Sequence, residues 1–167
     1  MSYAIVYSSR TGNTKALADA IRAVLPPEDC CYFGTPDAAA LAAQRLYIGF
    51  WTDKGTCDGD TAAFLAQLTN QEVFLFGTAG FGGSAGYFEQ IAHRVEALLP
   101  AGVTVLGHHL CQGRMPMTVR QRYEAMEDSP RRAQMLENFD AALSHPDAED
   151  LRQLQKSLSE ISIGMYN

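Results

Sequence analysis

Short apolar runs alternate with helical segments along this chain, and this alternation most limits the possible folds. The strongest runs cover residues 3–7, 46–51, 72–76 and 103–110, and a weaker one covers 30–33. Continuous apolar runs of this length are typical of strands buried on both faces. Strands of this kind that alternate with helices predict a parallel sheet with helices on both faces.

The segments between the runs have apolar residues on one helical face. Helical stripes follow the first three strong candidate strands: Leu17-Ile21, Thr61-Leu65 and Ile91-Val95. After Cys111 the pattern is helical throughout. We therefore expect an α/β, doubly wound sheet of five parallel strands in the order 2-1-3-4-5, with extra C-terminal helices. We also expect one domain, 1–167, with a core fold at 1–111 and a helical extension at 112–167.

The composition argues against two broad classes of function. The formal net charge is −6 and the pI is near 5.1, whereas nucleic-acid-binding proteins usually have a basic face. No segment of the sequence approaches the roughly 20 apolar residues of a membrane span. The four cysteines show no CxxC pair, which favours free thiols in a reducing compartment. We therefore expect a cytoplasmic protein without nucleic-acid or membrane partners.

The candidate ligand site lies in the loops after the strands, because ligands of such sheets bind beyond the carboxyl ends of the strands. Three loops lie there, at 8–14, 51–58 and 77–87. The first reads SSRTGNT and begins a helix. Its hydroxyl and amide groups, and the free N–H groups at the positive end of the helix, favour an anion. The loop is therefore a candidate phosphate cradle built mainly from neutral donors.

The first loop has a second interpretation, because serine and threonine also begin helices simply as N-caps. Two well-known phosphate motifs are excluded. Asn13 follows Gly12, and Ala16 follows Lys15, so the Walker A pattern is broken, and no G-x-G-x-x-G turn is present there. A receiver domain is disfavoured too, since Ser8-Ser9 stands where its acidic pair would follow the first strand.

The other two loops offer groups that suit a flat ring. Trp51, the only tryptophan, directly follows a candidate strand, where it either stacks on a planar ligand or caps the core. The third loop is glycine-rich and includes Phe81, and closely spaced glycines let the backbone approach a ring. Gly80, Gly82 and Ala85 match a loose dinucleotide pattern, which we attribute to chance because no acidic residue follows at the required spacing.

Nucleophilic and metal chemistry have little support in the sequence. Ser84 stands in a G-x-S-x-G pattern, but it lies well past the end of its strand, where a nucleophile elbow would begin. None of the four histidines pairs at i, i+4 with an acid between, and we expect His108 and His109 to be structural or exposed. We therefore assign no catalytic and no metal-ligating residue.

Taken together, these features resemble the flavodoxin family. Ser9-Arg10-Thr11-Gly12-Asn13-Thr14 matches in full the phosphate-loop signature [ST]-x-T-G-N-T of that family. The resemblance covers residues 1 to about 111. It implies a flavodoxin-like fold that binds FMN, with the 5′-phosphate in the first loop and the isoalloxazine ring beside the other two.

The resemblance also implies which residues bind the cofactor. The phosphate would be held by loop side chains and backbone: Ser9, Arg10, Thr11, Gly12, Asn13 and Thr14. The ring would be bordered by residues of the other two loops: Trp51, Thr52, Thr78, Ala79, Gly80, Phe81 and Gly82. Of these, the two aromatic residues are the candidates for stacking on the ring.

The chain departs from the family in its third loop. Many flavodoxins have an acidic residue there, in a Gly-Asp pair, where this sequence has Gly82-Gly83. One negative charge near the flavin is therefore missing, while Arg10 makes the phosphate loop more cationic. The stretches 49–55, 111–113 and 145–147 are similar to a flavodoxin subgroup of anaerobic bacteria, some of whose members accompany bilirubin-reducing enzymes.

Three functions are consistent with these residues. The leading hypothesis is an FMN-binding electron carrier that passes reducing equivalents to a partner oxidoreductase, in an oligomeric state that the sequence leaves open. The alternatives are an NAD(P)H-dependent FMN reductase, for which the sequence shows no second phosphate site, and an accessory module that binds flavin weakly or not at all. Arg114, Arg120 and Arg122 form a candidate docking or anion-binding patch, although arginines of this kind more often lie on a solvated helix face.

Overall fold

The computed structural model describes residues 1–82 and 84–164. Gly83, one half of the Gly-Gly pair in the third loop, lies outside these ranges. Five parallel strands form the centre of the molecule: β1 (Tyr3–Tyr7), β2 (Cys30–Gly34), β3 (Arg45–Asp53), β5 (Glu72–Ala79) and β6 (Thr104–Gln112). Their order is β2-β1-β3-β5-β6. Counted among the parallel strands alone, this is the predicted order 2-1-3-4-5, so the predicted fold class is confirmed.

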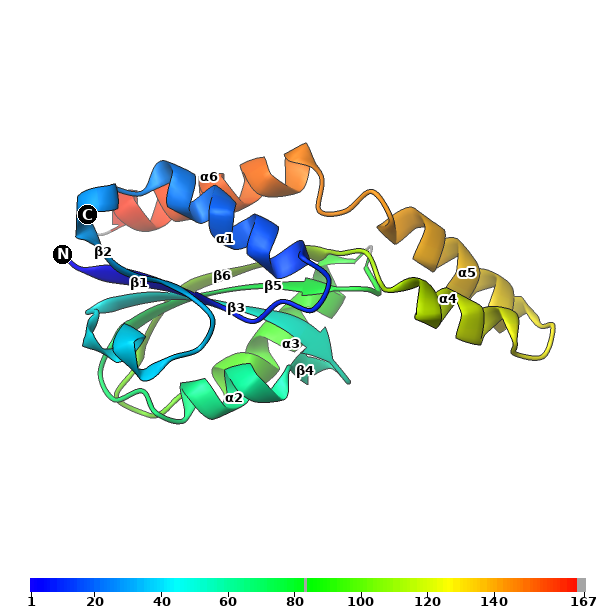
Figure 1. Cartoon of the computed structure of the whole chain (residues 1–167), viewed down its shortest axis with the longest axis horizontal. Coiled ribbons are helices and arrows are strands. Elements are labelled where there is room, and N and C mark those ends of the chain that lie inside the picture. Colours follow the sequence, from blue (N-terminus) through cyan, green and yellow to red (C-terminus); the bar gives the residue numbers. More distant parts are fainter. Residues whose placement is uncertain (83, 165–167) are drawn as a thin grey trace.

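Helices cover both faces of the sheet, as Figure 1 shows. The face covered by α1 (Asn13–Val24) and α6 (Ala148–Gly164) lies opposite the face covered by α2 (Gly59–Leu65) and α3 (Ala85–Glu96). Each face has its own cluster of buried apolar side chains. Two short 3-10 helices, η1 (Pro27–Asp29) and η2 (Ala38–Ala42), connect the first three strands. The second of these lies in the alanine-rich segment that precedes β3.

The structure corrects where two of the predicted loops begin. The loop predicted from Thr52 instead continues β3 to Asp53 and then returns as the two-residue strand β4 (Thr56–Cys57). Lys54 and Gly55 turn the chain with φ angles of 53° and 84°, as a tight hairpin turn requires. β5 similarly runs to Ala79 rather than stopping at 76. Backbone pairing with neighbouring strands lengthens both elements beyond their apolar runs.

The helices after β6 divide into two parts. α4 (Met117–Glu124) and α5 (Pro130–Ala142) pack on each other and project beyond the carboxyl ends of the strands (Figure 1). We call these two helices the C-terminal hairpin. α6 instead returns along the sheet, where Leu154 and Leu158 are buried with side chains of α1. The segment expected as an extension thus contributes to the core. Within the described ranges, no helix has the length and apolar character needed to cross a membrane.

Two glycine–phenylalanine pairs join β3 to β5. Gly49 is the register partner of Phe76, and Phe50 is the register partner of Gly77. A Cβ on Gly49 would lie 2.2 Å from Cε2 of Phe76, and one on Gly77 would lie 2.6 Å from Cε2 of Phe50. Each glycine therefore leaves room for the ring of the other strand. Phe50 and Phe76 belong to the core clusters on opposite faces of the sheet. The two pairs therefore fix the packing of β3 against β5 on both faces.

We predict that Gly49→Ala destabilises the protein by about 1–3 kcal/mol, because overpacking of a filled core forces side chains out of place. Gly86→Ala is the matched control, since an added Cβ at that position in α3 would meet nothing within 4 Å. Urea unfolding monitored by circular dichroism measures both variants. Equal midpoints for Gly49→Ala and the wild type would contradict the interlocked packing.

An ion cluster joins β6 to α3. His108 Nδ1 lies 2.8 Å from Oε1 of Glu96, and its Nε2 lies 2.8 Å from Oε1 of Glu89. Burial alone lowers the pKa of His108, but hydrogen bonds with the two carboxylates raise it above its usual value. The folded protein thus keeps this proton to a higher pH than the unfolded chain does, and the histidinium stabilises the fold.

The stabilisation by His108 is complete below about pH 6.5, the ordinary histidine pKa, and is lost as the pH rises through the raised pKa of the folded state. We predict that the wild type loses roughly 0.5–1 kcal/mol across this window relative to His108→Gln, as is usual for partly exposed ion pairs. Urea unfolding at several pH values gives the difference between the two proteins. A difference that does not vary with pH would rule out this coupling.

Candidate functional site

The carboxyl ends of the central strands surround a cavity of about 170 Å³. Its lining comes from all three predicted loops and from the segment after β6. Eight of the thirteen predicted cofactor residues line it: Arg10, Thr11, Asn13, Trp51, Thr52, Thr78, Ala79 and Gly80. The structure therefore brings most of the predicted site residues together. Ser9, Gly12, Thr14, Phe81 and Gly82 are not among the lining residues.

The first loop presents backbone donors to this edge of the sheet. Gly12 occupies the N-cap position of α1 with a left-handed φ of 88°, and it has no side chain to cap the helix. Oγ of Ser9 accepts hydrogen bonds from the N–H groups of Gly12 and Lys15. Within the described residues, the N–H groups of Arg10, Thr11, Asn13 and Thr14 have no hydrogen-bond acceptor. These free donors at the positive end of a helix suit an anion.

The side chains of the first loop have other partners. Oγ1 of Thr11 and Nδ2 of Asn13 donate to the carbonyl oxygen of Arg114, at 3.3 and 2.7 Å. Thr14 is buried, and its hydroxyl donates to the carbonyl of Phe50, 3.2 Å away. Thr14 thus attaches the start of α1 to β3. The backbone of this residue, rather than its hydroxyl, is the group available to a ligand.

The second loop holds Trp51 at the cavity. Asp58, which is buried, accepts from the N–H of Trp51 at 3.4 Å, and its own N–H donates to the Trp51 carbonyl. The same carboxylate accepts from the N–H and the hydroxyl of Thr61 and so caps α2. The guanidinium of Arg10 lies 5.5 Å from the centre of the Trp51 ring, within cation–π range. Sequence reasoning missed Asp58, although an aspartate before a helical stripe is an N-cap signal.

Two oxygen atoms in the cavity lining lack partners. Oδ1 of Asn13 and Oγ1 of Thr52 are buried, and neither has a hydrogen bond in the part of the chain described. Buried polar groups rarely stay unpaired. Asp53 also lines the cavity, so the second loop places a carboxylate there. Asn13 and Thr52 thus each bring one buried, unpaired oxygen atom to the residues that line the cavity.

The third loop is held by the end of β6, by Met115 after it and by α5. A Cβ on Gly80 would lie 2.5 Å from Sδ of Met115, so Gly80 leaves room for that side chain. The carbonyl of Gly80 accepts from Nε2 of Gln112 and Nδ2 of Asn138, each at 3.1 Å. Phe81 is 44% exposed and lies outside the cavity lining.

The lining residues after β6 were not predicted as part of this site, although Arg114 belongs to the candidate arginine patch. They are Gly113, Arg114, Met115, Pro116 and Val119. The helical pattern of this region gave no local signal for contact with the first loop. Gly113 packs closely against Asn13, and an added Cβ would lie 2.5 Å from Nδ2 of that residue. This contact explains why residue 113 is a glycine.

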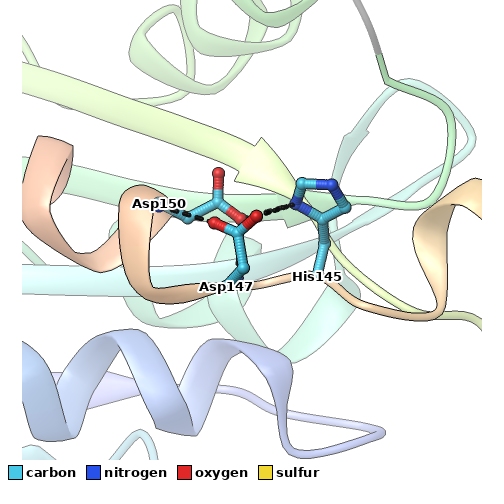
Figure 2. Close-up of side chains that lie close together, drawn as sticks. All are labelled: His145, Asp147 and Asp150. Atoms are coloured by element: carbon cyan, nitrogen blue, oxygen red, sulfur yellow. Dashed lines mark hydrogen bonds and ion pairs between the residues drawn. The ribbon is translucent and has the colours of Figure 1, made fainter.

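A cluster of His145, Asp147 and Asp150 begins α6 (Figure 2). The N–H of Asp150 donates to Oδ1 of Asp147 at 2.9 Å, and the N–H of Asp147 donates to Oδ2 of Asp150 at 2.8 Å. This reciprocal pairing resembles a capping box, and the Asp150 backbone N–H lowers the pKa of Asp147. Nδ1 of His145 lies 2.6 Å from the same Oδ2. These residues are of metal-ligand type, but their bonds account for them as a helix cap.

The three arginines of the candidate patch do not lie together as one site. Arg120 pairs with Glu124 and with Asp140, 3.0 Å away, as expected for a solvated helix face. Arg114 instead lies at the cavity, and its N–H donates to the carbonyl of His145 at 3.1 Å. The helix cap in Figure 2 therefore also fixes the backbone of Arg114.

Comparisons with known proteins agree with this architecture. Residues 4–159 match the flavodoxin domain family. The chain is 41% identical to the flavodoxin-like domain-containing protein BilS of Clostridium symbiosum, over 95% of this chain and 94% of the relative. It is 29% identical to the protein of the same name from Clostridioides difficile, over 90% of each.

Solved structures show the same fold at low sequence identity. Oxidised flavodoxin 2 from Bacillus cereus aligns with a TM-score of 0.56 and 16% identity, over 98% of this chain and 99% of that one. A flavoprotein in complex with FMN from Lactobacillus acidophilus aligns with a TM-score of 0.52 and 17% identity, over 65% of this chain and 92% of that one.

We predict that Asp58→Ala destabilises the protein by about 1–2 kcal/mol, because α2 loses its cap and a buried hydroxyl loses its acceptor. The variant should also make Trp51 more accessible to acrylamide, since the strand end that holds it loosens. Asp60→Ala is the control, because Asp60 is exposed in the same helical turn. The link between Asp58 and Trp51 fails if acrylamide quenches both variants equally.

Proposed function

Because the chain belongs to the flavodoxin family, we propose that it binds FMN at this cavity and passes reducing equivalents to a partner oxidoreductase. One observation carries the proposal. The unpartnered N–H groups at the start of α1 lie at the rim of a cavity bordered by Trp51. An anionic group and a flat ring in one molecule match these two features.

The phosphate part of FMN suits the first loop. Four free N–H groups, from Arg10, Thr11, Asn13 and Thr14, supply donors, and the guanidinium of Arg10 supplies a positive charge. A dianionic phosphate is stabilised by such donors and by the positive end of α1. Gly12, at the turn of the loop, has no side chain that would block the approach of a phosphate. The residues present therefore fit the group.

The remainder of FMN suits the cavity. Trp51 offers an aromatic face, and the side chain of Met115 fills the space that Gly80 leaves after β5. The orphan oxygens of Asn13 and Thr52 would accept from ribityl hydroxyls. Typical ligand pockets measure about 300–1,000 Å³, more than the 170 Å³ of this cavity. We therefore propose that the side chain of Met115 moves to admit the ring, while the backbone around Arg114 stays in place.

When bound, FMN supplies the capacity to accept and release electrons, and the chain positions it at the edge of the sheet. The C-terminal hairpin projects from the same edge (Figure 1), so a partner that approaches the flavin would meet it. The resemblance to the subgroup that accompanies bilirubin-reducing enzymes supports an oxidoreductase as that partner. All four cysteines are free, which supports a cytoplasmic location.

We predict that the purified protein binds FMN with one site per chain and that FMN quenches the fluorescence of Trp51, the only tryptophan. Thr11→Asp should weaken FMN binding at least about tenfold, because it places a negative charge beside the phosphate. It should leave riboflavin, which has no phosphate, within about twofold. Thr104→Asp at the opposite edge of the sheet is the control. A protein that binds no added FMN would refute the proposal.

The same preparations separate a carrier from an enzyme. A carrier oxidises NADH and NADPH no faster than free FMN does, whereas an NAD(P)H-dependent reductase turns them over in the steady state. Reduction of a partner oxidoreductase that requires both the protein and its flavin would support the carrier.

A further inference from the structure

We propose that Arg114, at the base of the C-terminal hairpin, is a phosphate ligand of the flavin site and determines selectivity for FMN over riboflavin. The inference rests on the proposed function and adds to it a residue outside the phosphate-loop signature. Three observations carry it: the position of the guanidinium, its lack of an acidic partner, and the anchoring of its backbone.

The guanidinium of Arg114 lies over the turn of the first loop. Its Nη2 is 4.0 Å from the place that a Cβ would take on Gly12. The side chain is exposed and lines the cavity together with Arg10. Arg10 and Arg114 thus line the cavity from two different segments of the chain.

The charge of Arg114 is not used within the described structure. Arg45, Arg120 and Arg132 each lie within 4 Å of a carboxylate. Arg114 has no such ion pair among the residues described, and Asp53, the carboxylate of the cavity lining, pairs with neither lining arginine. An unpaired guanidinium beside unpartnered N–H groups leaves a site with excess positive charge, which suits a phosphate dianion.

The backbone of Arg114 is fixed on both sides. Its carbonyl accepts from Thr11 and Asn13 of the first loop, and its N–H donates to His145. The preceding residue, Gly113, donates from its N–H to the carbonyl of Ala79 at 3.0 Å. The Cα of Arg114 is therefore held close to the loop before any ligand arrives, and only side-chain torsions must adjust. Preorganisation of this kind lowers the entropic cost of binding.

The hydrogen bonds to the Arg114 carbonyl also connect the first loop to the segment after β6. Thr11 and Asn13 donate to its carbonyl, while their N–H groups face the anion site. A phosphate held by the guanidinium and by this loop would tie the loop to the segment that leads into the C-terminal hairpin.

The test compares Arg114→Gln with Arg122→Gln, a matched change at an exposed arginine of α4 that does not line the cavity. Dissociation constants for FMN and riboflavin are measured by quenching of flavin and Trp51 fluorescence at low and at physiological salt. We expect Arg114→Gln to weaken FMN binding about tenfold or more at low salt, as for loss of a charge-assisted contact. Riboflavin binding should change less than about twofold, and Arg122→Gln should change neither.

Arg114→Lys tests whether the loss of affinity comes from the missing charge or from a disturbed fold. It should recover part of the FMN affinity, because the charge remains while the planar fork is lost. An equal loss for FMN and riboflavin, or no loss for either, would overturn the inference while leaving FMN binding by the wild type intact. A wild type that binds neither flavin would overturn the proposed function itself and this inference with it.

Discussion

The reciprocal packing of Gly49 with Phe76 and of Phe50 with Gly77 is the contact on which the site depends. It fixes the register of β3 against β5, and the two strands therefore end side by side, with Trp51 opposite Thr78. A slip of one residue would place each ring against a backbone position that already has a side chain. The cavity lies at these strand ends, so its width follows from core packing rather than from the loops themselves.

Hydrogen bonds then attach the surrounding elements to this fixed edge. Thr14 joins α1 to β3, Asp58 joins α2 to the end of β3, and Gly113 joins the segment after β6 to β5. Each bond reaches the backbone of a strand end or of a neighbouring segment. The elements around the cavity are thus hydrogen-bonded to the ends of β3 and β5. A preformed binding site needs rigid support of this kind.

The fold could be predicted from the sequence because apolar runs and helical stripes are local signals, and the SSRTGNT loop combines its donors within a few residues. The remaining features depend on contacts distant in the chain. β4 is a strand only because it pairs with the end of β3. Arg114 and Met115, which line the cavity, come from a segment about 100 residues after the first loop. The orphan oxygens of Asn13 and Thr52 become visible only once burial is known.

The position of α6 in the chain determines when the anion site can be completed during folding. It packs on α1 and β6, and Nε2 of Gln155 donates to the carbonyl of Ala20 at 3.1 Å. During synthesis the first loop and α1 therefore leave the ribosome long before the helix that covers them. Until α6 follows, the apolar face of α1 lacks Leu154 and Leu158, and the carbonyl of His145 is not yet in place to fix Arg114. The anion site is thus among the first parts to be made and among the last to be complete.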